Sequence, residues 1–566
     1  MYEESSHRNE APVALRTCPQ NQGPLMVAAV LVILPTFLMS MTRATPIQWE
    51  PAGIKVSLAA GQRSEPENPI TGWVAPSLVR IGTTDAPGTD SSIRLSGGRG
   101  ETVDSQVAVR APANRSLTTV NVSASNLKGP GGATIAASNI TLFREYYLTT
   151  KGTNSVQGSN PPPGAGTYAE PLIPFNDAET GTALCDSSAT LKACNATISA
   201  SQNQPYWVDF FIPRGAGNSP AGTYTGTILV RSDQGSMTIP VTLNVWNFEL
   251  PLVASEKSLF LYWTNERDAS AHQALLRNKV MPWYASSSAA RSHRSKWGLN
   301  RTGLDIYSYI GIKCNGSYNS LPSASQIKKW AAGNPSGVSL DFYPADEITG
   351  CPAAYAPLTI LADNAHRAGV KILVTIPPVS ALYGVVDHWT MLTFNWPESL
   401  SGIPGDFWSY CSCNIGGGNT PEWMVDYPPI NERIQTGFLN QTQRASGILY
   451  WRTDNWREGD TIGSWDHVET QGCGQGYNRP GDGILVYPPG PIASSEPAPG
   501  IRLKAIRDGI QDYEYVEILK KLGQSAFANS VIKPIATSWN IWTHDPNELI
   551  AARMQLGRKL NELSTP

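Results

Sequence analysis

The chain is poor in charge. Asp, Glu, Lys and Arg make up only 16% of its 566 residues, whereas ordinary soluble chains carry ~25%. The 43 basic residues nearly balance the 46 acidic ones, and the formal net charge is -3. Binding to nucleic acid or to an anionic membrane surface needs a basic excess that this chain does not have. We therefore expect no nucleic acid among its partners.

Histidine and cysteine are scarce as well. The seven His residues show neither an HExxH nor a His-x-His spacing, and Cys411 and Cys413 are too close for the usual zinc pairs. We therefore expect no metal and no cofactor. Cys185 and Cys194 flank a short segment that a local disulfide would close. The cysteines Cys314, Cys351, Cys411, Cys413 and Cys473 allow two more bridges and one free thiol, with their connectivity left open.

Long hydrophobic runs are rare, and the one that stands out is LMVAAVLVILPTFLMSM, residues 25–41. Its ~17 apolar-leaning residues are near the lower limit for a membrane-spanning helix, and Pro35 interrupts them. Thr42, Arg43 and Ala44 follow as a small-x-small pattern, which is typical of a signal-peptide cleavage site. We expect residues 1–45 to be a signal peptide and the protein to be secreted, periplasmic or on the cell surface. An uncleaved membrane anchor is the alternative.

Turn-forming residues are abundant, with 50 Gly and 44 Pro. Over residues 46–251 they separate short β-branched runs such as YWVDFFIP and GTYTGTILVRSD. Short strands broken by turn clusters are typical of an antiparallel sandwich. The sequence therefore predicts an accessory β-sandwich domain over this range.

From residue 258 onward, strand-like and helical segments alternate, as in SLFLYW, AHQALLRNKV, VSLDFYP, PLTILADNAHRAGV and KILVTIP. This alternation predicts a parallel sheet with helices outside it. Later strand candidates are VVDHW, DFWSYCS and GILYWRTDNW, enough for a catalytic (β/α)8 TIM-like barrel over residues 252–530. Near its end, IRLKAIRDGIQDYEYVEILKKLG predicts a packed amphipathic helix. A helical tail over residues 531–566 would include a helix from about 547 to 562.

The segment GVSLDFYPADE places two adjacent carboxylates, Asp346 and Glu347, directly after an apolar strand. In a (β/α) barrel the chemistry lies on the loops that leave the carboxyl ends of the strands. Neighbouring residues in a strand point to opposite faces, so both acids can reach one ligand only where the strand ends. Pro344 favours such an exit from the ladder. Adjacent acids are also common on solvated surfaces, which is the alternative reading.

Aromatic and polar residues at the other predicted strand ends are candidates to bind a sugar, because flat aromatic faces stack on sugar rings and a tyrosyl hydroxyl can hold an acetamido carbonyl. Core packing explains each aromatic alone better, and only their clustering favours the group. His388 is equally explained as a structural histidine, and Asp454 as a helix cap. The candidates are Tyr262, Trp263, Asn265, Tyr343, Asp387, His388, Trp389, Trp408, Tyr410, Tyr450, Trp451, Asp454 and Trp456, with Asp387, His388 and Trp389 expected to end a strand.

Five segments together resemble glycoside hydrolase family 123 in their order and spacing. They are AGTYTGTILV (221–230), IPVTLNVWNFELP (239–251), the pair Asp346 and Glu347, GDGILVYPPG (481–490) and RLKAIRDGIQDYEY (502–515). The resemblance covers roughly residues 50 to 525. The segment ASSSAARSHRSKWGLNRT, residues 285–302, corresponds to no motif that we can place, and Ile348 follows the acids where the family often has proline.

The resemblance implies a β-N-acetylgalactosaminidase with a β-sandwich ahead of a (β/α)8 barrel. It implies that Glu347 is the general acid/base and that Asp346 orients the substrate's 2-acetamido group, whose oxygen is the nucleophile. We expect a retaining exo-acting hydrolase whose partner is a glycan or glycoconjugate with terminal N-acetylhexosamine. One alternative is a glycosidase for β-N-acetylglucosamine or a non-acetamido glycan. Another is a non-catalytic carbohydrate-binding protein. The oligomeric state is left open.

Overall fold

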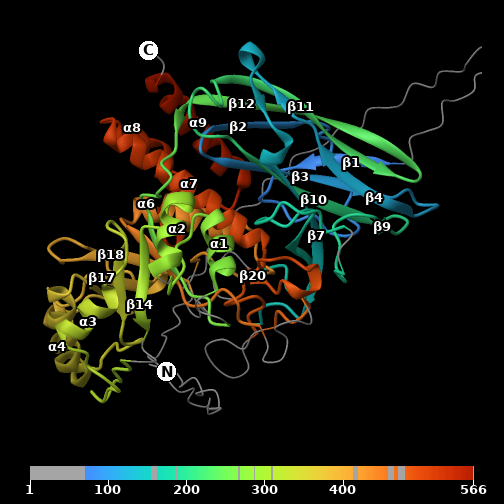
Figure 1. Cartoon of the computed structure of the whole chain (residues 1–566). Helices are drawn as coiled ribbons and strands as arrows, with labels where there is room; N and C mark the ends of the chain where they lie inside the picture. The colour runs from blue at the N-terminus through green and yellow to red at the C-terminus, as the bar shows by residue number, and fades with distance from the viewer. Residues whose placement is uncertain are drawn as a thin grey trace, which may run out of the picture. The chain divides into compact units, whose positions relative to one another are not determined.

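A computed structural model describes residues 70–154, 162–185, 188–264, 268–285, 287–306, 310–411, 419–456, 465–469 and 478–564 (Figure 1). These residues all fall within one contact unit, Asn68–Pro566. The apolar segment 25–41 and three residues named above, Asn265, Cys413 and Cys473, lie outside the described ranges. No helix within these ranges is long and apolar enough to cross a membrane.

Two sheets form the amino-terminal domain. The first has the order β1 (Thr71–Ala75), β3 (Thr102–Arg110), β10 (Asn203–Phe211), β7 (Ile140–Thr150), β8 (Gly166–Pro174). The second has the order β2 (Ile93–Arg99), β12 (Gly235–Glu249), β11 (Gly222–Ser232), β4 (Leu117–Ala124), β9 (Ala196–Ile198), with β5 (Leu127–Lys128) and β6 (Thr134–Ile135) beside β11. Their alternating apolar residues share one core, which includes Val208, Ile228 and Leu243. The predicted antiparallel β domain is confirmed, except that β2 pairs with β12 in parallel.

A nearly closed parallel sheet follows, and every neighbouring pair in it is parallel. Its order is β13 (Lys257–Phe260), β19 (Gly447–Tyr450), β18 (Asp406–Tyr410), β17 (His388–Leu392), β16 (Lys371–Val374), β15 (Ser339–Tyr343), β14 (Arg301–Ile306). Between β13 and β14, Pro282 forms an isolated bridge with Phe260 and accepts a hydrogen bond from the Thr302 hydroxyl at 3.3 Å. Among the described residues the sheet therefore has seven strands, and the expected eight-stranded barrel is not confirmed.

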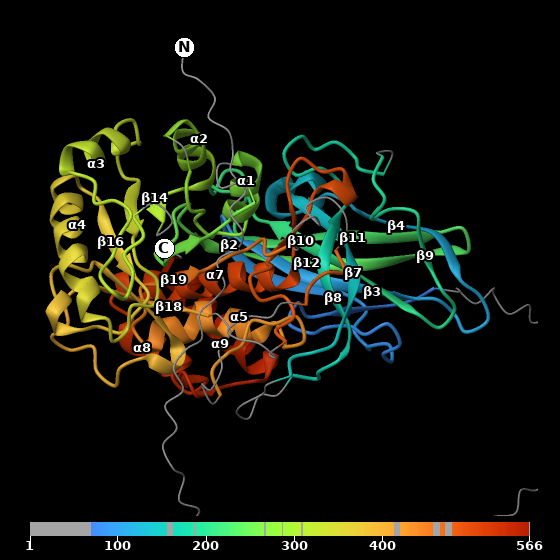
Figure 2. The ribbon, with the colours of Figure 1, turned by 90° about the horizontal axis from the view of Figure 1, so that it is seen from below.

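Helices connect these strands on the outside of the sheet. They are α1 (Ala269–Arg277), α2 (Ser287–Trp297), α3 (Ala324–Ala331), α4 (Tyr355–Arg367), α5 (Ile430–Ile434) and α6 (Asn440–Thr442). Leu358 and Leu361 of α4 share one apolar cluster with Ile372 of β16, and Figure 2 shows α3 and α4 beside β16. The sheet is thus covered on its outer face, as parallel sheets require.

The helix α7 (Ile501–Lys521) is buried on all sides from Ile501 to Val516. The predicted packed helix is confirmed, and its polar residues are buried as well. Some of them contact the β domain: Arg507 pairs with Asp104 and Asp209, and Lys504 donates to Asp209 at 2.9 Å. These ion pairs join segments that are distant in the sequence, so periodicity alone could not reveal them.

The chain ends in α8 (Ser525–Ile532), a small hairpin of β22 (Ala536–Ser538) and β23 (Ile541–Trp542), and α9 (Pro546–Ser564). The last helix lies close to its predicted position. The short strands β20 (Val486–Tyr487) and β21 (Ala498–Pro499) precede α7.

Two disulfides are present in the described part of the chain. The expected local bridge Cys185–Cys194 is confirmed, and Cys314 pairs with Cys351. Cys411 is a buried free thiol. The second bridge closes the segment between β14 and the loop that carries Asp346 and Glu347.

Candidate active site

The acidic pair lies in the loop that leaves the carboxyl end of β15. Both Asp346 and Glu347 reach solvent, but the hydrogen bonds to their carboxyl groups are partly buried. Glu347 has a φ of 47°, in the left-handed region that residues other than glycine rarely adopt. The backbone N–H of Glu347 donates to the Thr375 hydroxyl at 2.9 Å, and that hydroxyl donates to Asp346 at 3.1 Å. Thr375 directly follows β16 and therefore fixes both the unusual backbone and the first acid.

Each acid also has its own tyrosine. The hydroxyl of Tyr343, the last residue of β15, donates to Asp346, and that of Tyr410, the last residue of β18, donates to Glu347 at 2.6 Å. Burial and the adjacent carboxylate raise the pKa of each phenol well above its usual value. Both tyrosines therefore remain protonated donors at neutral pH.

The pKa of Glu347 is raised by desolvation of its carboxyl group and by the negative charge of Asp346, while the hydrogen bond from Tyr410 lowers it. The net effect favours the protonated form relative to an ordinary glutamate. A carboxyl group that keeps its proton closer to neutral pH is suited to act as a general acid.

Three partly buried side chains, Trp263, Tyr284 and Leu392, pack against the apolar cluster that contains Tyr343 and Tyr410. The indole Nε1 of Trp263 is buried and has no hydrogen-bond partner among the described residues. Tyr284 has a φ of 72°, a second left-handed residue near the acids. Trp263 was predicted, whereas Thr375, Tyr284 and Leu392 were missed. The signal for Thr375 was present, because it is a polar residue directly after the apolar strand in KILVTIP.

Asp454 is used by the protein backbone. Its buried carboxylate accepts the backbone N–H groups of Trp263 at 3.0 Å and Thr264 at 2.6 Å, and Arg452 donates to it at 3.3 Å. The guanidinium of Arg452 lies 5.3 Å from the centre of the Trp263 ring. Asp454 therefore holds the loop after β13 in place, a role like that of the cap considered above.

Four other predicted aromatic residues, Tyr262, Tyr450, Trp451 and Trp456, contact neighbouring side chains or backbone in the interior. Tyr450 and Trp451 both donate to Asp482, at 3.5 Å and 3.2 Å. Trp456 donates to the Val486 carbonyl at 3.0 Å and meets the edge of Tyr262, with ring centres 6.0 Å apart. These contacts connect the loop after β19 to the segment ahead of α7, and none of them is to the acids.

The prediction that Asp387, His388 and Trp389 end a strand is wrong, because β17 begins at His388. In VVDHW the apolar residues lie before the strand, so the sequence places the end of a strand where β17 begins. Since the strands are parallel, these residues lie at the amino end of the sheet, away from the acids. Trp389 donates to the Pro404 carbonyl at 2.8 Å, and Asp387 accepts from His366 at 2.8 Å.

At this amino end, charged side chains pair with one another. Arg301 donates to both oxygens of Asp341, at 2.7 Å and 2.6 Å, and His388 lies 3.1 Å from Asp341 and 3.4 Å from Asp406. The ring of Trp408 stacks on His388 with centres 4.8 Å apart. Trp408 is thus part of this inner layer, although its neighbour in sequence, Tyr410, reaches Glu347.

Comparisons with known proteins bear on this arrangement. Two family models match the chain: the glycoside hydrolase 123 N-terminal domain over residues 83–232 and the glycoside hydrolase 123 catalytic domain over residues 387–519. Together they span half of the chain, and neither includes the acidic pair. No curated protein matches the sequence.

Among solved structures, the chain is similar to a family 123 glycoside hydrolase from Clostridium perfringens that was studied for glycolipid glycan hydrolysis. The two are 13% identical with a TM-score of 0.57, over 88% of this chain and 100% of that one. β-Glucuronidases from Parabacteroides merdae and Bacteroides uniformis are each 9% identical, with TM-scores of 0.24 and 0.23. The alignments cover 62% and 68% of this chain and 47% of each β-glucuronidase chain. TM-scores this low support no conclusion about this chain.

Proposed function

The chain belongs to glycoside hydrolase family 123 and is a glycosidase that acts on glycans, and from that premise we propose that it is a retaining, exo-acting enzyme that releases terminal β-linked N-acetylgalactosamine. The observation that supports this most is that the two adjacent acids are held by different groups. Asp346 accepts hydrogen bonds from Tyr343 and Thr375, which stabilise a carboxylate, whereas the pKa of Glu347 is raised. The pair thus combines an acceptor oriented by two hydroxyl groups with a group that favours its proton.

We propose a mechanism in which the sugar supplies the nucleophile. Glu347 transfers its proton to the glycosidic oxygen as the bond to the anomeric carbon breaks, and the oxygen of the 2-acetamido group forms a new bond to that carbon. Asp346 accepts the amide N–H and offsets the positive charge of the oxazolinium-type ring. Glu347, now a carboxylate, takes a proton from water as the water opens this ring. The released sugar then has its original configuration.

The proximity of the internal nucleophile explains why two acids in one loop are enough. An attacking group that belongs to the substrate is already held near its target and needs no second enzymic carboxylate on the opposite side of the ring. The exposed position of both acids at the end of the sheet fits a terminal sugar that enters from solvent.

We also propose that the parallel sheet is a (β/α)8-type barrel in which residues 281–285 take the place of the second strand. Met281 accepts a hydrogen bond from Phe260 at 2.8 Å, and Ala285 donates to Thr302 at 2.8 Å, so this segment bridges β13 and β14. Secretion or surface display remains a proposal, and the two disulfides support it because disulfides persist in oxidising compartments.

The decisive experiment compares aryl β-glycosides of N-acetylgalactosamine, N-acetylglucosamine and galactose. Turnover of the first, with the galactoside losing mainly kcat, is the expected result, because a 2-hydroxyl cannot replace the attacking acetamido oxygen. A thiazoline mimic of the cyclic intermediate should then bind more tightly than substrate. A covalent 2-fluoroglycosyl ester on a carboxylate, with indifference to the thiazoline, would refute the mechanism. Binding of all three sugars without turnover would indicate a carbohydrate-binding protein.

A further inference from the structure

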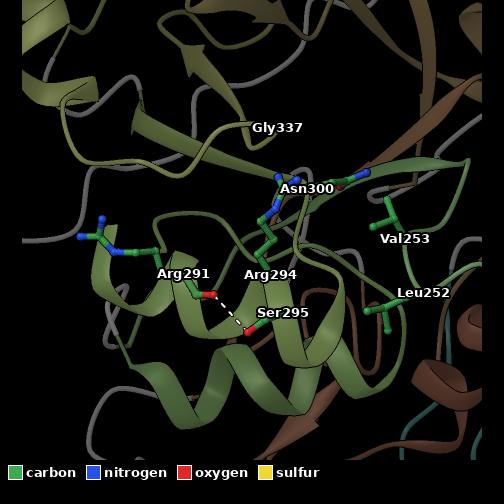
Figure 3. A pocket seen from close by; sticks show the side chains of 7 residues that line it. All are labelled: Leu252, Val253, Arg291, Arg294, Ser295, Asn300 and Gly337. Atoms are coloured by element: carbon green, nitrogen blue, oxygen red, sulfur yellow. Dashed lines mark hydrogen bonds between the residues drawn. The ribbon is translucent and has the colours of Figure 1, made fainter.

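The segment that the family resemblance leaves unexplained, residues 285–302, lines a pocket of about 630 Å³ (Figure 3). Arg291, Arg294 and Asn300 form its polar side, and Leu252 and Val253 form its apolar side. Asn300 directly precedes β14, whereas the acidic pair follows β15. Because these strands are parallel, the pocket lies at the amino end of the sheet, opposite the candidate active site.

The two arginines of this pocket have no counter-charge. Within the described part of the chain, no carboxylate forms an ion pair with the guanidinium of Arg291 or Arg294, although the nearby Arg301 is paired with Asp341. The helix α2 that carries both arginines contains no acidic residue. Planar guanidinium groups with free N–H donors are the groups that proteins use to hold oxyanions in a two-pronged contact.

The guanidinium of Arg294 lies against a glycine turn. Gly337 has a φ of 80°, and a Cβ built on it would lie 2.4 Å from Nη1 and 2.7 Å from Nη2 of Arg294. Only glycine therefore allows both this backbone and the observed place of the guanidinium. Figure 3 shows Arg294 extending toward Asn300 and the Gly337 turn, whereas Arg291 points to the other side.

Asn300 adds an unsatisfied polar group. Its buried Oδ1 atom has no hydrogen-bond partner among the described residues, and a buried polar atom without a partner is unfavourable unless something else binds there. An amide oxygen accepts hydrogen bonds, so a hydroxyl or N–H group of a ligand would satisfy it.

We propose that this pocket binds a tetrahedral oxyanion, a sulfate or phosphate monoester, carried on a glycoconjugate. Arg294 holds two of its oxygens, and the Asn300 Oδ1 accepts a hydrogen bond from a hydroxyl of the sugar that bears the ester. Leu252 and Val253 contact the carbon skeleton that bears the ester, a surface that a free ion does not use. The volume is also that of a small-molecule site rather than an ion site. Because the pocket is remote from Asp346 and Glu347, it anchors a charged glycan without taking part in the chemistry.

The test measures binding of galactose 6-sulfate to the full chain by calorimetry at constant ionic strength, with galactose, inorganic sulfate and inorganic phosphate as comparison probes. We expect the sulfated sugar to bind and galactose not to bind at this site. Arg294→Ala should weaken binding by about tenfold or more, which is typical for loss of a charge-assisted contact. Lys296→Ala is the matched control, because Lys296 lies on the same helix with its ammonium 5.0 Å from the Trp297 ring and does not line the pocket.

Gly337→Ala is the second variant, because it displaces the Arg294 guanidinium without removing a charge. We expect a similar loss of binding while release of an aryl glycoside is unchanged, which also shows that the variant is folded. Equal weakening by Lys296→Ala would show diffuse electrostatic attraction and overturn the proposal, as would the absence of binding. If inorganic sulfate or phosphate binds as tightly as the ester, the assignment to a glycoconjugate is wrong. The binding results do not depend on which sugar the active site cleaves, because only the folding control uses turnover.

Discussion

At the carboxyl end of the parallel sheet, Asp346 and Glu347 are held by hydroxyl groups, whereas at the amino end Asp341 and Asp406 are held by cations. Arg301 and His388 contact Asp341, and Lys257 pairs with Asp406. Within the described residues no Lys, Arg or His pairs with either acid of the carboxyl end. The same sheet thus carries two layers of carboxylates with different kinds of partner.

The kind of partner determines whether a carboxylate at each end of the sheet can take part in chemistry. A cation lowers the pKa of its partner and neutralises its charge, as the lowered pKa values of Asp341 and Asp406 show. A hydroxyl group orients a carboxylate but leaves its charge in place. The amino end is therefore arranged for stability, and the carboxyl end keeps both acids free of cation partners for chemistry.

The largest effect is expected for Glu347→Gln, which leaves the loop intact but removes the proton. Turnover of substrates with poor leaving groups should fall by about 10²–10⁴-fold, and that of aryl glycosides with good leaving groups much less. Steady-state kinetics on both substrate kinds check this. Equal losses on both would contradict a role as general acid.

Asp346→Asn should impair both kinds of substrate to a similar extent, because formation of the cyclic intermediate needs the anion whichever group leaves. The same two assays give the comparison with Glu347→Gln. Near-normal release from an aryl glycoside would rule out the substrate-assisted mechanism.

At the amino end, Asp341→Asn should lower stability rather than change the chemistry. It leaves the buried Arg301 without a counter-charge, which typically costs about 3–5 kcal/mol. Since the folded-state pKa of Asp341 is lowered, its contribution to stability is present above the pKa of the unfolded chain and is lost as the pH falls. Chemical unfolding across acidic pH measures this. A changed alkaline limb of the activity profile with unchanged stability would contradict the separation of the two ends.

Tyr410→Phe should shift the pH profile with a smaller loss of activity, within about tenfold, the order of one lost hydrogen bond. The Tyr410 hydroxyl lowers the pKa of Glu347, so without it that pKa rises. Glu347 then stays protonated to higher pH, and the alkaline limb of kcat should move upward. A downward shift would mean that another group sets this limb. Tyr450→Phe is a matched control, because its hydroxyl contacts Asp482.

The smallest expected effect is the difference in kcat between variants that open one or the other disulfide. Cys314→Ser opens the bridge that ends four residues after Glu347, so the acid loop should loosen and kcat should fall severalfold. Cys185→Ser opens the bridge in the β domain and should leave kcat unchanged. Kinetics at matched folded fractions separate the two cases. Identical kcat values for both variants would show that the loop needs no covalent fixing.

The acids and their two tyrosines were predictable because they follow a local rule, in which polar groups at the end of an apolar strand meet at one edge of the sheet. Thr375 obeys the same rule and could have been found. The start of β17 was misplaced because Val385 and Val386 continue the apolar pattern ahead of the strand. The burial of the polar residues of α7 was not predictable, since their partners Asp104 and Glu170 are hundreds of residues away in sequence.

The buried ion pairs of α7 have a consequence for synthesis on the ribosome. Arg502 reaches Glu170 and Lys504 reaches Asp209 across sequence separations of 332 and 295 residues. At ~5–20 residues per second, Glu170 and Asp209 therefore emerge roughly 15–60 s before these two cations. Until then Asp209 lacks Lys504, and Glu170 has Arg80 of its own domain as its cation partner. Translation must reach α7 before the first half of the protein can acquire its final stability.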